Sequence, residues 1–480
     1  MSENDRLLEQ WHEAEAYAEE MVPLIGALYR NRDVITSIYG RNIVRCSSTE
    51  IVKAHRYARQ VVGRELSLTQ SIEVLKALAE LPLDSCRADL GRLTDGFHHP
   101  DQVDSLEDYL ASALGPVLSG SGRLLSEPTD VVLYGFGRIG RLLARILIER
   151  TGSGAKLRLR AIVLRPGGEG DAHKRASLLR RDSVHGPFSG TIRVDEEKNC
   201  IIANGNEIQL IHADAPEDVD YTAYGIHQAI VIDNTGKWRD EAGLGRHLQA
   251  TGVDKVLLTA PGRGSIKNII FGINHEQIQD DDRALSAASC TTNAIVPVLK
   301  VMHDEFEIVS GHMETVHAYT NDQNLTDNFH KKARRGRSAP LNLVITETGA
   351  ATAVAKALPE LEGRLTGNAI RVPTPNVSLA ILNLELGREA GADEINAYLR
   401  RLSVDSPFRD QIDFTTSDEI VSSDLVGSDR AGVVDSKATI VNGRRCVLYV
   451  WYDNEAGYSY QVVRIAQELA GLRYPAVPVY

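Results

Sequence analysis

The stretch Val131-Val-Leu-Tyr-Gly-Phe-Gly-Arg-Ile-Gly140 decides how the larger part of this 480-residue chain is expected to fold. It opens with an apolar run typical of a buried strand and ends in a glycine turn of the pattern G-x-G-x-x-G. Residues 141–150 have helical spacing, and residues 157–164 form the next apolar run. This order begins a doubly wound parallel sheet, in which the glycine turn holds the diphosphate of a dinucleotide. The alternative is a tight turn that carries no ligand.

The residue after the second strand bears on which dinucleotide is bound. An NAD site usually has an acidic residue here, whose carboxylate binds the ribose hydroxyls. In this chain the strand ends at Leu164 and Arg165 follows, and a guanidinium pairs well with a 2′-phosphate. We therefore expect use of NADP or of both cofactors. The alternative is that Arg165 points into solvent and that cofactor choice is set elsewhere.

The residues before this stretch follow a different pattern. Between Asp5 and Arg30, apolar residues recur with helical spacing, and Ser47 with Glu50 marks a further helix start. Comparable strand-like runs are missing, so this region is expected to be all helical. The segment Ser119-Gly-Ser-Gly122 is expected to be a flexible joint.

Composition excludes several classes of protein. The 53 Lys and Arg residues against 65 Asp and Glu give a net charge of −12, which disfavours nucleic acid and anionic membranes as partners. No apolar run approaches the roughly 20 residues that span a bilayer, and the first residues lack the features of a signal peptide. Five scattered cysteines fit a reducing cytoplasm. No H-E-x-x-H or C-x-x-C pattern occurs, so no metal is expected.

The segment Ala288-Ser-Cys-Thr-Thr-Asn293 is the strongest candidate for chemistry. It places Cys290 at the start of an expected helix, where the dipole and the unpaired amides stabilise a thiolate. An isolated cysteine is more often a small core residue. The polar residues around Cys290 are unusual for a core position, so the pattern favours a reactive thiol.

Six blocks in sequence order resemble the phosphorylating glyceraldehyde-3-phosphate dehydrogenase family across about residues 129–475. The blocks are Tyr134–Arg141, Ala288–Asn293, Val316–Thr320, Thr348–Ala351, Arg371–Val377 and Trp451–Ser459. The resemblance implies an α/β fold with a Rossmann-type dinucleotide-binding domain, an α+β catalytic domain with a mixed sheet, and a homotetramer. An all-α domain would precede them.

The resemblance also suggests domain boundaries. The all-helical extension would comprise residues 1–127. The NAD(P)-binding domain would comprise residues 128–289, completed by a C-terminal helix of residues 454–480. The catalytic domain would comprise residues 290–453.

The resemblance implies that Cys290 is the nucleophile and His317 its base. Addition of the thiolate to an aldehyde gives a hemithioacetal, and removal of the hydroxyl proton lets hydride leave for the nicotinamide. Inorganic phosphate then converts the thioester to an acyl phosphate. The implied substrate is glyceraldehyde 3-phosphate, in glycolysis or gluconeogenesis.

Further site residues come from the same resemblance. The cofactor would contact Gly135, Gly137, Arg138, Ile139, Gly140, Arg165, Thr235, Gly236, Asn454 and Tyr458. The substrate phosphate would contact Thr320, Asp322 and Arg371. The attacking phosphate would contact Ser289, Thr291, Thr348 and Gly349. Hydroxyl groups and one guanidinium suit a dianion, because they donate hydrogen bonds to it.

The run His330-Lys-Lys-Ala-Arg-Arg-Gly-Arg337 is the densest positive segment. It is either a solvated loop or the family loop that reaches the cofactor of a neighbouring subunit. Family members selective for NAD tend to carry Leu-Pro shortly before it, where this chain has Asn328-Phe329. This departure is a second indication of NADP use.

Two other functions stay open on the sequence alone. One is an erythrose-4-phosphate dehydrogenase, which shares the thiol and the base but hydrolyses its thioester. The other is a non-catalytic regulatory homologue that acts through a protein partner of its N-terminal domain.

Overall fold

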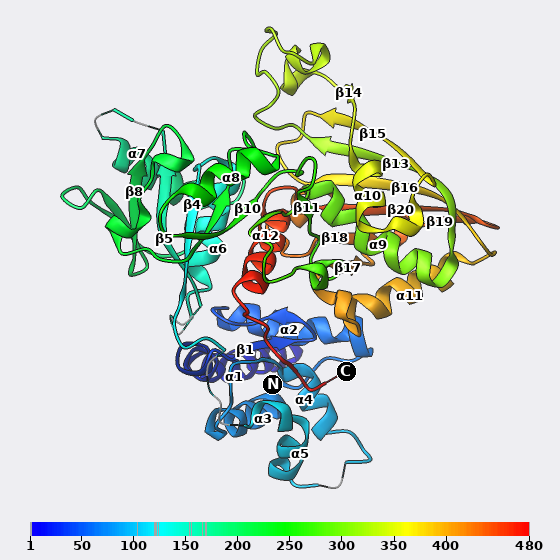
Figure 1. Cartoon of the computed structure of the whole chain (residues 1–480). Coiled ribbons are helices and arrows are strands. Elements are labelled where there is room, and N and C mark those ends of the chain that lie inside the picture. Colours follow the sequence, from blue (N-terminus) through cyan, green and yellow to red (C-terminus); the bar gives the residue numbers. More distant parts are fainter. Residues whose placement is uncertain are drawn as a thin grey trace. The chain divides into compact units, whose positions relative to one another are not determined.

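The computed structural model describes residues 2–102, 104–119, 122, 124–152, 154, 156–165, 167–168 and 170–479. The chain divides into two compact units (Figure 1). Unit 1 comprises Met1–Pro128, Thr151–Lys156 and Gly471–Tyr480, and unit 2 comprises Thr129–Arg150 and Leu157–Ala470. Among the residues described, no helix is both long enough and apolar enough to cross a membrane.

The first half of unit 2 is a nine-stranded sheet in the order β11-β12-β10-β9-β4-β5-β8-β7-β6. The strands from β11 to β8 are parallel, and β6 and β7 extend the sheet antiparallel. Strand β9 is buried along its whole length, as expected for a parallel strand covered on both faces. The strands are β4 (Thr129–Tyr134), β5 (Leu157–Leu164), β6 (Ile192–Asp195), β7 (Cys200–Ala203), β8 (Asn206–His212), β9 (Ala229–Asp233), β10 (Val253–Leu258), β11 (Lys267–Asn268) and β12 (Ala284–Ser286). The helices are α6 (Arg138–Glu149), α7 (Asp171–Arg180) and α8 (Glu241–Gln249). The predicted Rossmann-type domain is confirmed.

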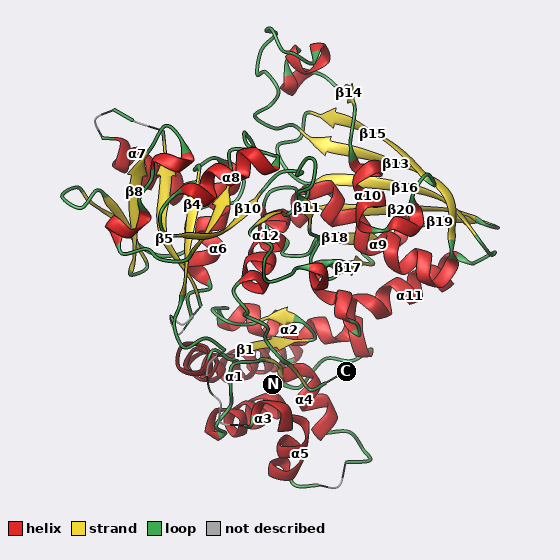
Figure 2. Ribbon diagram, in the orientation of Figure 1, coloured by secondary structure: helices red, strands yellow, loops and turns green. Residues whose placement is uncertain are grey.

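The second half of unit 2 is an eight-stranded mixed sheet in the order β14-β15-β13-β16-β20-β18-β17, with β19 paired to β20. Its strands are β13 (Ile308–Ala318), β14 (Val344–Thr346), β15 (Leu365–Val372), β16 (Ser378–Leu386), β17 (Ile412–Thr415), β18 (Gly432–Asp435), β19 (Ile440–Asn442) and β20 (Arg445–Tyr452). Its helices are α9 (Cys290–Phe306), α10 (Ala350–Ala357) and α11 (Ala392–Val404), followed by α12 (Ala456–Leu469). Helix α9 contacts β13, β16 and β20, and α12 packs against α6 (Figure 2). The mixed sheet is the one predicted.

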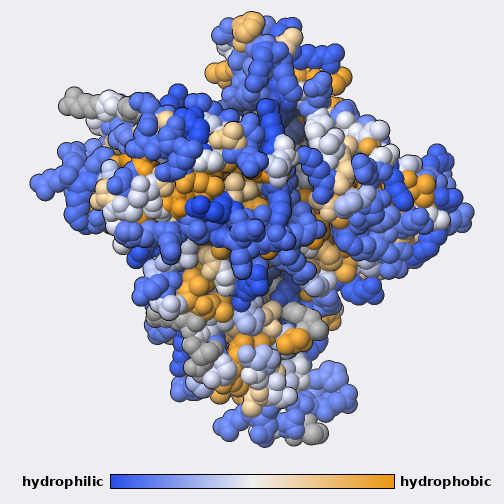
Figure 3. Space-filling model, viewed as in Figure 1, coloured by the Kyte–Doolittle hydropathy of each residue, from blue (hydrophilic) through white to orange (hydrophobic). Residues whose placement is uncertain are grey.

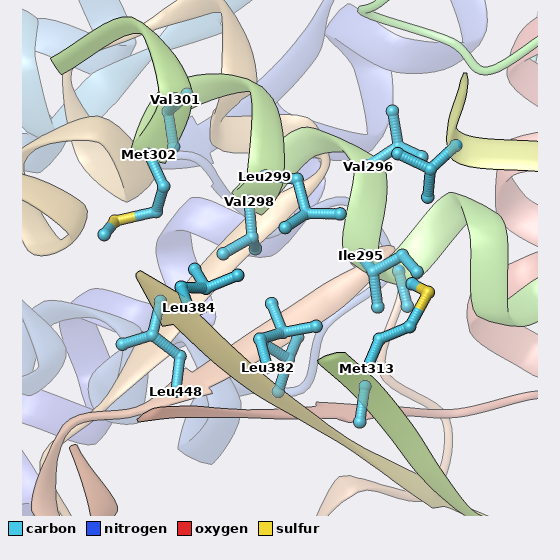
Figure 4. Close-up of a cluster of buried hydrophobic side chains, with 14 of the residues drawn as sticks. Ile295, Val296, Val298, Leu299, Val301, Met302, Met313, Leu382, Leu384 and Leu448 are labelled. Atoms are coloured by element: carbon cyan, nitrogen blue, oxygen red, sulfur yellow. The ribbon is translucent and has the colours of Figure 1, made fainter. Parts of the chain in front are cut away.

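One face of the mixed sheet forms the core of this half. Burial alternates along β16, so every second side chain points to α9. Figure 4 shows Leu299 and Met302 of α9 above Leu382, Leu384 and Leu448 of the sheet. The packing fixes α9 against the strands that carry the other site residues.

Unit 1 is mainly helical, as predicted, and its helices are α1 (Glu3–Arg32), α2 (Ser48–Val62), α3 (Leu68–Glu80), α4 (Leu90–Phe97) and α5 (Leu106–Ala113). The prediction that it is all helical is wrong in one respect, because a four-stranded sheet in the order β2-β1-β3-β21 is also present. The strands are β1 (Ile35–Ile38), β2 (Arg41–Asn42), β3 (Arg87–Asp89) and β21 (Ala476–Val477). They are short, and β21 comes from the far end of the chain. In the predicted joint, Gly120 and Ser121 lie outside the described residues.

Unit 1 therefore contains two segments that lie far from its helices in the sequence. The predicted C-terminal helix ends at Leu469, and the following residues belong to unit 1 rather than to the dinucleotide domain. The Nζ of Lys156 lies 3.2 Å from the Asp33 carboxylate, and both side chains are almost fully buried. The same Nζ lies 4.5 Å from the ring centroid of Tyr29 and 5.3 Å from that of Tyr474. One ammonium group thus joins all three segments of unit 1.

Replacing Lys156 by alanine is expected to destabilise unit 1 by about 3–5 kcal/mol, because the positive charge beside a buried carboxylate is lost. Amide hydrogen exchange in β1 and β3 would measure the effect. Lys198→Ala is the matched control, since Lys198 pairs with Glu207 at the exposed surface, where solvent screens the pair. Equal exchange rates in the two variants would contradict the prediction.

Candidate active site

The thiol of Cys290 lies at the start of α9. The hydroxyl of Ser289 caps this helix by accepting a hydrogen bond from the Thr292 N–H at 3.1 Å. Cys290 is partly exposed, and the backbone amides of Cys290 and Thr291 act to lower the pKa of its thiol. The local sequence thus folds so that the thiol lies at the start of the helix.

His317 lies beside the thiol on β13. Its Nε2 is 3.5 Å from Cys290 Sγ, and its Nδ1 is 2.7 Å from the Ala318 carbonyl oxygen. Arg371 NH1 also lies 2.9 Å from this Nδ1. In the tautomer whose Nδ1–H donates to the Ala318 carbonyl, the lone pair of Nε2 faces the sulfur. Arg371 is the register partner of His317 on β15, and its NH1 donates to the same carbonyl at 2.9 Å. Sheet pairing therefore brings base and guanidinium together.

Burial controls the protonation of this pair. Burial raises the pKa of the Cys290 thiol, while the charge of Arg371 and the amides at the helix start lower it. Burial, followed by the charge of Arg371, lowers the pKa of His317 to about 3. The helix start was expected to favour a thiolate, but burial outweighs the dipole in this structure. The imidazole is therefore neutral at physiological pH, and the lone pair of its unprotonated nitrogen is available.

The glycine turn has the geometry of an anion cradle. Gly135 has a φ of +95°, and a Cβ on Gly140 would lie 2.5 Å from the Gly135 carbonyl oxygen. Gly137 is the N-cap of α6, where no side chain caps the helix. Asn234 donates through Nδ2 to the Gly135 carbonyl at 3.5 Å, and the Thr235 methyl group packs against Gly135. These residues fit the diphosphate of a dinucleotide.

Asn454 lies just before α12, and Tyr458 lies in the first turn of this helix. Both are linked by hydrogen bonds to the segments that carry His317 and Cys290. Ser378 donates through Oγ to Asn454 Oδ1 at 2.7 Å and accepts from the Ala318 N–H at 3.1 Å. Tyr458 donates through its hydroxyl to the Ala288 carbonyl at 3.1 Å. Hydrogen bonds therefore connect both residues to the segments that carry the base and the thiol.

Two of the predicted cofactor residues, Arg138 and Arg165, have surroundings that differ from those of the other predicted cofactor residues. Arg138 donates to Glu455 at 2.9 Å and to Asp182 at 2.6 Å, so its guanidinium is engaged by two carboxylates. Arg165 is exposed at the end of β5. Gly135, Gly137, Ile139, Gly140, Thr235 and Gly236 lie at the glycine turn or beside it.

The predicted residues for the substrate phosphate include one carboxylate. Asp322 forms an ion pair with Arg335 and lies 3.6 Å from His330 Nε2. Arg335 also donates through Nε to Thr346 Oγ1 at 3.2 Å, and its charge contributes to the lowered pKa of His317. The carboxylate thus holds a guanidinium close to the site. Sequence reasoning did not single out Arg335, although the basic run contains it.

Several residues that were predicted to bind the attacking phosphate already form hydrogen bonds within the protein. Ser289 caps α9, and Thr291 Oγ1 lies 2.9 Å from the Tyr452 hydroxyl. Thr348 Oγ1 accepts from the Ala350 N–H at 3.2 Å, and Gly349 is the N-cap of α10 without a side-chain cap. Thr320 lies in the loop that follows β13. Within the described part of the chain, no group of three or more His, Cys, Asp or Glu side chains could hold a metal ion.

Comparison with known proteins adds an independent finding. Residues 129–241 match the family described as glyceraldehyde 3-phosphate dehydrogenase, NAD binding domain, and residues 289–454 match glyceraldehyde 3-phosphate dehydrogenase, C-terminal domain. A glyceraldehyde-3-phosphate dehydrogenase-like protein of Pseudomonas aeruginosa (strain UCBPP-PA14) is 60% identical over 460 residues, covering 95% of this chain and 100% of that protein. The glyceraldehyde-3-phosphate dehydrogenase of Borreliella burgdorferi is 39% identical over 346 residues, covering 71% of this chain and 99% of that protein.

A glyceraldehyde-3-phosphate dehydrogenase of Pseudomonas aeruginosa (strain PAO1) is similarly related, with 40% identity over 343 residues, 72% of this chain and 98% of that protein. The last two relatives have no counterpart for more than a quarter of this chain, whereas the first spans nearly all of it. These matches do not favour an erythrose-4-phosphate dehydrogenase or a non-catalytic homologue. The chain belongs to the glyceraldehyde-3-phosphate dehydrogenase family and has the fold of an NAD-dependent oxidoreductase.

Proposed function

We propose that the protein is a phosphorylating glyceraldehyde-3-phosphate dehydrogenase in which Cys290 is the nucleophile and His317 is the base. The observation that carries this proposal is the 3.5 Å separation of Sγ and Nε2. Arg371 and Arg335 supply positive charge close to this pair. A thiol, a base and guanidinium groups together suit an aldehyde that bears a phosphate.

The proposed reaction begins when Sγ attacks the aldehyde carbon and the thiol proton passes by way of His317 Nε2 to the carbonyl oxygen, which becomes the hydroxyl of the hemithioacetal and leaves the imidazole neutral again. The backbone N–H of Cys290 and the imidazole stabilise the oxygen of the hemithioacetal. His317 next accepts the hydroxyl proton as hydride leaves the carbon, which becomes a thioester. Bound NAD(P) would supply the hydride acceptor, held by the glycine turn and by Asn454. Inorganic phosphate attacks the thioester, giving an acyl phosphate and the free thiol.

The phosphate step distinguishes this proposal from an erythrose-4-phosphate dehydrogenase. Without phosphate, we expect one equivalent of reduced cofactor per site and then a halt, because the thioester has no acceptor. Rapid-mixing absorbance at 340 nm, with and without phosphate, would measure both phases. Continued turnover without phosphate would indicate a hydrolytic enzyme instead, and the absence of a burst would revive the non-catalytic alternative.

We further propose that the enzyme uses NADP or both cofactors, on the basis of Arg165 and Phe329, which is 91% exposed. Arg165→Asp is expected to raise the KM for NADP by about tenfold or more and to change the KM for NAD less, since a carboxylate repels a 2′-phosphate. Arg193→Asp, an exposed change on β6, is the matched control. An unchanged KM for NADP in Arg165→Asp would contradict this assignment.

We also propose a cytoplasmic homotetramer. The segment between β13 and β14 has several large apolar side chains at its surface, among them Leu325, Leu341 and Leu343. Figure 3 shows apolar surface on the part of unit 2 that carries this segment. Contiguous apolar surface of this kind marks association sites. Mass measurement by light scattering would test the assembly, and a monomer would contradict it.

A further inference from the structure

Tyr452, the last residue of β20, bridges the two elements of the candidate active site. Its side chain is 1% exposed. Its hydroxyl lies 2.9 Å from Thr291 Oγ1 and 2.6 Å from Thr315 Oγ1. Thr291 follows Cys290 on α9, and Thr315 precedes His317 by two residues on β13. One buried hydroxyl therefore connects the helix of the thiol with the strand of the imidazole.

The hydroxyl groups of Tyr452, Thr291 and Thr315 can form one chain of hydrogen bonds that ends at the Cys290 thiol, because either oxygen of each pair can be the donor. Burial raises the pKa of the Cys290 thiol, and hydrogen bonds from the Thr291 amide and hydroxyl act in the opposite direction. Because each hydroxyl carries one proton, a Thr291 hydroxyl that donates to Sγ has to accept its own bond from Tyr452. In this arrangement Tyr452 accepts in turn from Thr315. Hydrogen bonds in such a chain polarise and strengthen one another.

The aromatic ring of Tyr452 makes a separate contact. It lies edge-on to the His317 imidazole, with ring centroids 6.0 Å apart and an interplanar angle of 81°. Phenylalanine at this position would keep the ring contact and remove only the hydroxyl. The two roles of the side chain are therefore separable by experiment.

We propose that Tyr452 is a positioning residue, which directs the Thr291 hydroxyl at the Cys290 sulfur and thereby makes the thiolate easier to form. The inference rests on the proposed function, because it requires Cys290 to be the nucleophile. Tyr452 acts through Thr291 and not on the substrate.

The test is the pH dependence of Cys290 alkylation by iodoacetamide, followed by mass spectrometry of the Cys290 peptide. Tyr452→Phe is expected to react roughly three- to tenfold more slowly than wild type at pH 7.5, because a smaller fraction of the thiol is ionised. The two rates should converge at high pH. Thr291→Val should show the same shift, and the double variant should react no more slowly than Thr291→Val. Tyr449→Phe, on the opposite face of β20, should match wild type.

Several outcomes would overturn the proposal. An unshifted profile in Tyr452→Phe, even with a reduced kcat, would show that the tyrosine only packs against its neighbours. If the double variant were slower than Thr291→Val by the same factor by which Tyr452→Phe is slower than wild type, Tyr452 would not act through Thr291. Should Tyr452→Phe fold poorly, Thr315→Val keeps the tyrosine and should give the same shift. If wild-type Cys290 reacts no faster than the four other cysteines, the proposed function itself fails.

Discussion

Replacing Cys290 by alanine is expected to lower kcat for aldehyde oxidation by roughly 10⁴-fold or more, because no thioester can form. Cofactor binding should be retained, since the glycine turn and the start of α12 are separate from the sulfur. Steady-state assays and cofactor titration by fluorescence quenching would measure the two effects.

Cys46→Ala is the matched control for this variant. Cys46 lies in unit 1 and is partly exposed, and its thiol lies 3.6 Å from the carbonyl oxygen of Asn42. Its removal should leave kcat unchanged. A Cys290→Ala enzyme that keeps a tenth of wild-type activity would refute a covalent route through this sulfur.

Replacing His317 by asparagine is expected to lower kcat by about 10²- to 10⁴-fold, as usual for the loss of a positioned base. The pKa of His317 is lowered to about 3 by burial and by Arg371, so the wild-type imidazole stays neutral well below pH 6. The burst of reduced cofactor should become slow in the variant, because hydride leaves only as the hydroxyl proton is removed. Rapid mixing across pH 5–9 would measure the burst rate.

His312→Asn, on the same strand, controls for this change. His312 is exposed and hydrogen-bonds to Thr366 at 2.8 Å and to Asn368 at 2.9 Å. Its replacement should leave the burst rate close to that of wild type. A burst in His317→Asn as fast as in wild type would mean that another group takes the proton.

Features that depend on neighbouring residues in the sequence were predicted best. Strand β5 has the predicted bounds, and Ser47 with Glu50 forms a capping box at the predicted helix start. The glycine turn is equally local, because the conformation and close approach of Gly135 and Gly140 follow from their missing side chains. These elements need no information from distant parts of the chain.

Features that depend on distant contacts were missed or misjudged. The sheet of unit 1 was not predicted, because β3 pairs with β21 from the other end of the chain. The ion pair between Asp322 and Arg335 was not predicted either, although Asp322 is a predicted phosphate contact and Arg335 lies in the basic run 330–337. The domain boundaries within unit 2 and the roles of the site residues stay predictions.

The sequence by itself determined the dinucleotide turn, the place of Cys290 at a helix start and the family of the chain, because each follows from short runs of neighbouring residues. Only the tertiary structure decided the surroundings of the thiol. Tyr452 reaches Thr291 across 161 residues of sequence, and Arg371 reaches His317 by strand pairing. Burial by such distant residues outweighs the helix dipole and raises the pKa of the thiol, since desolvation depends on every atom packed around the sulfur and not on the order of residues beside it.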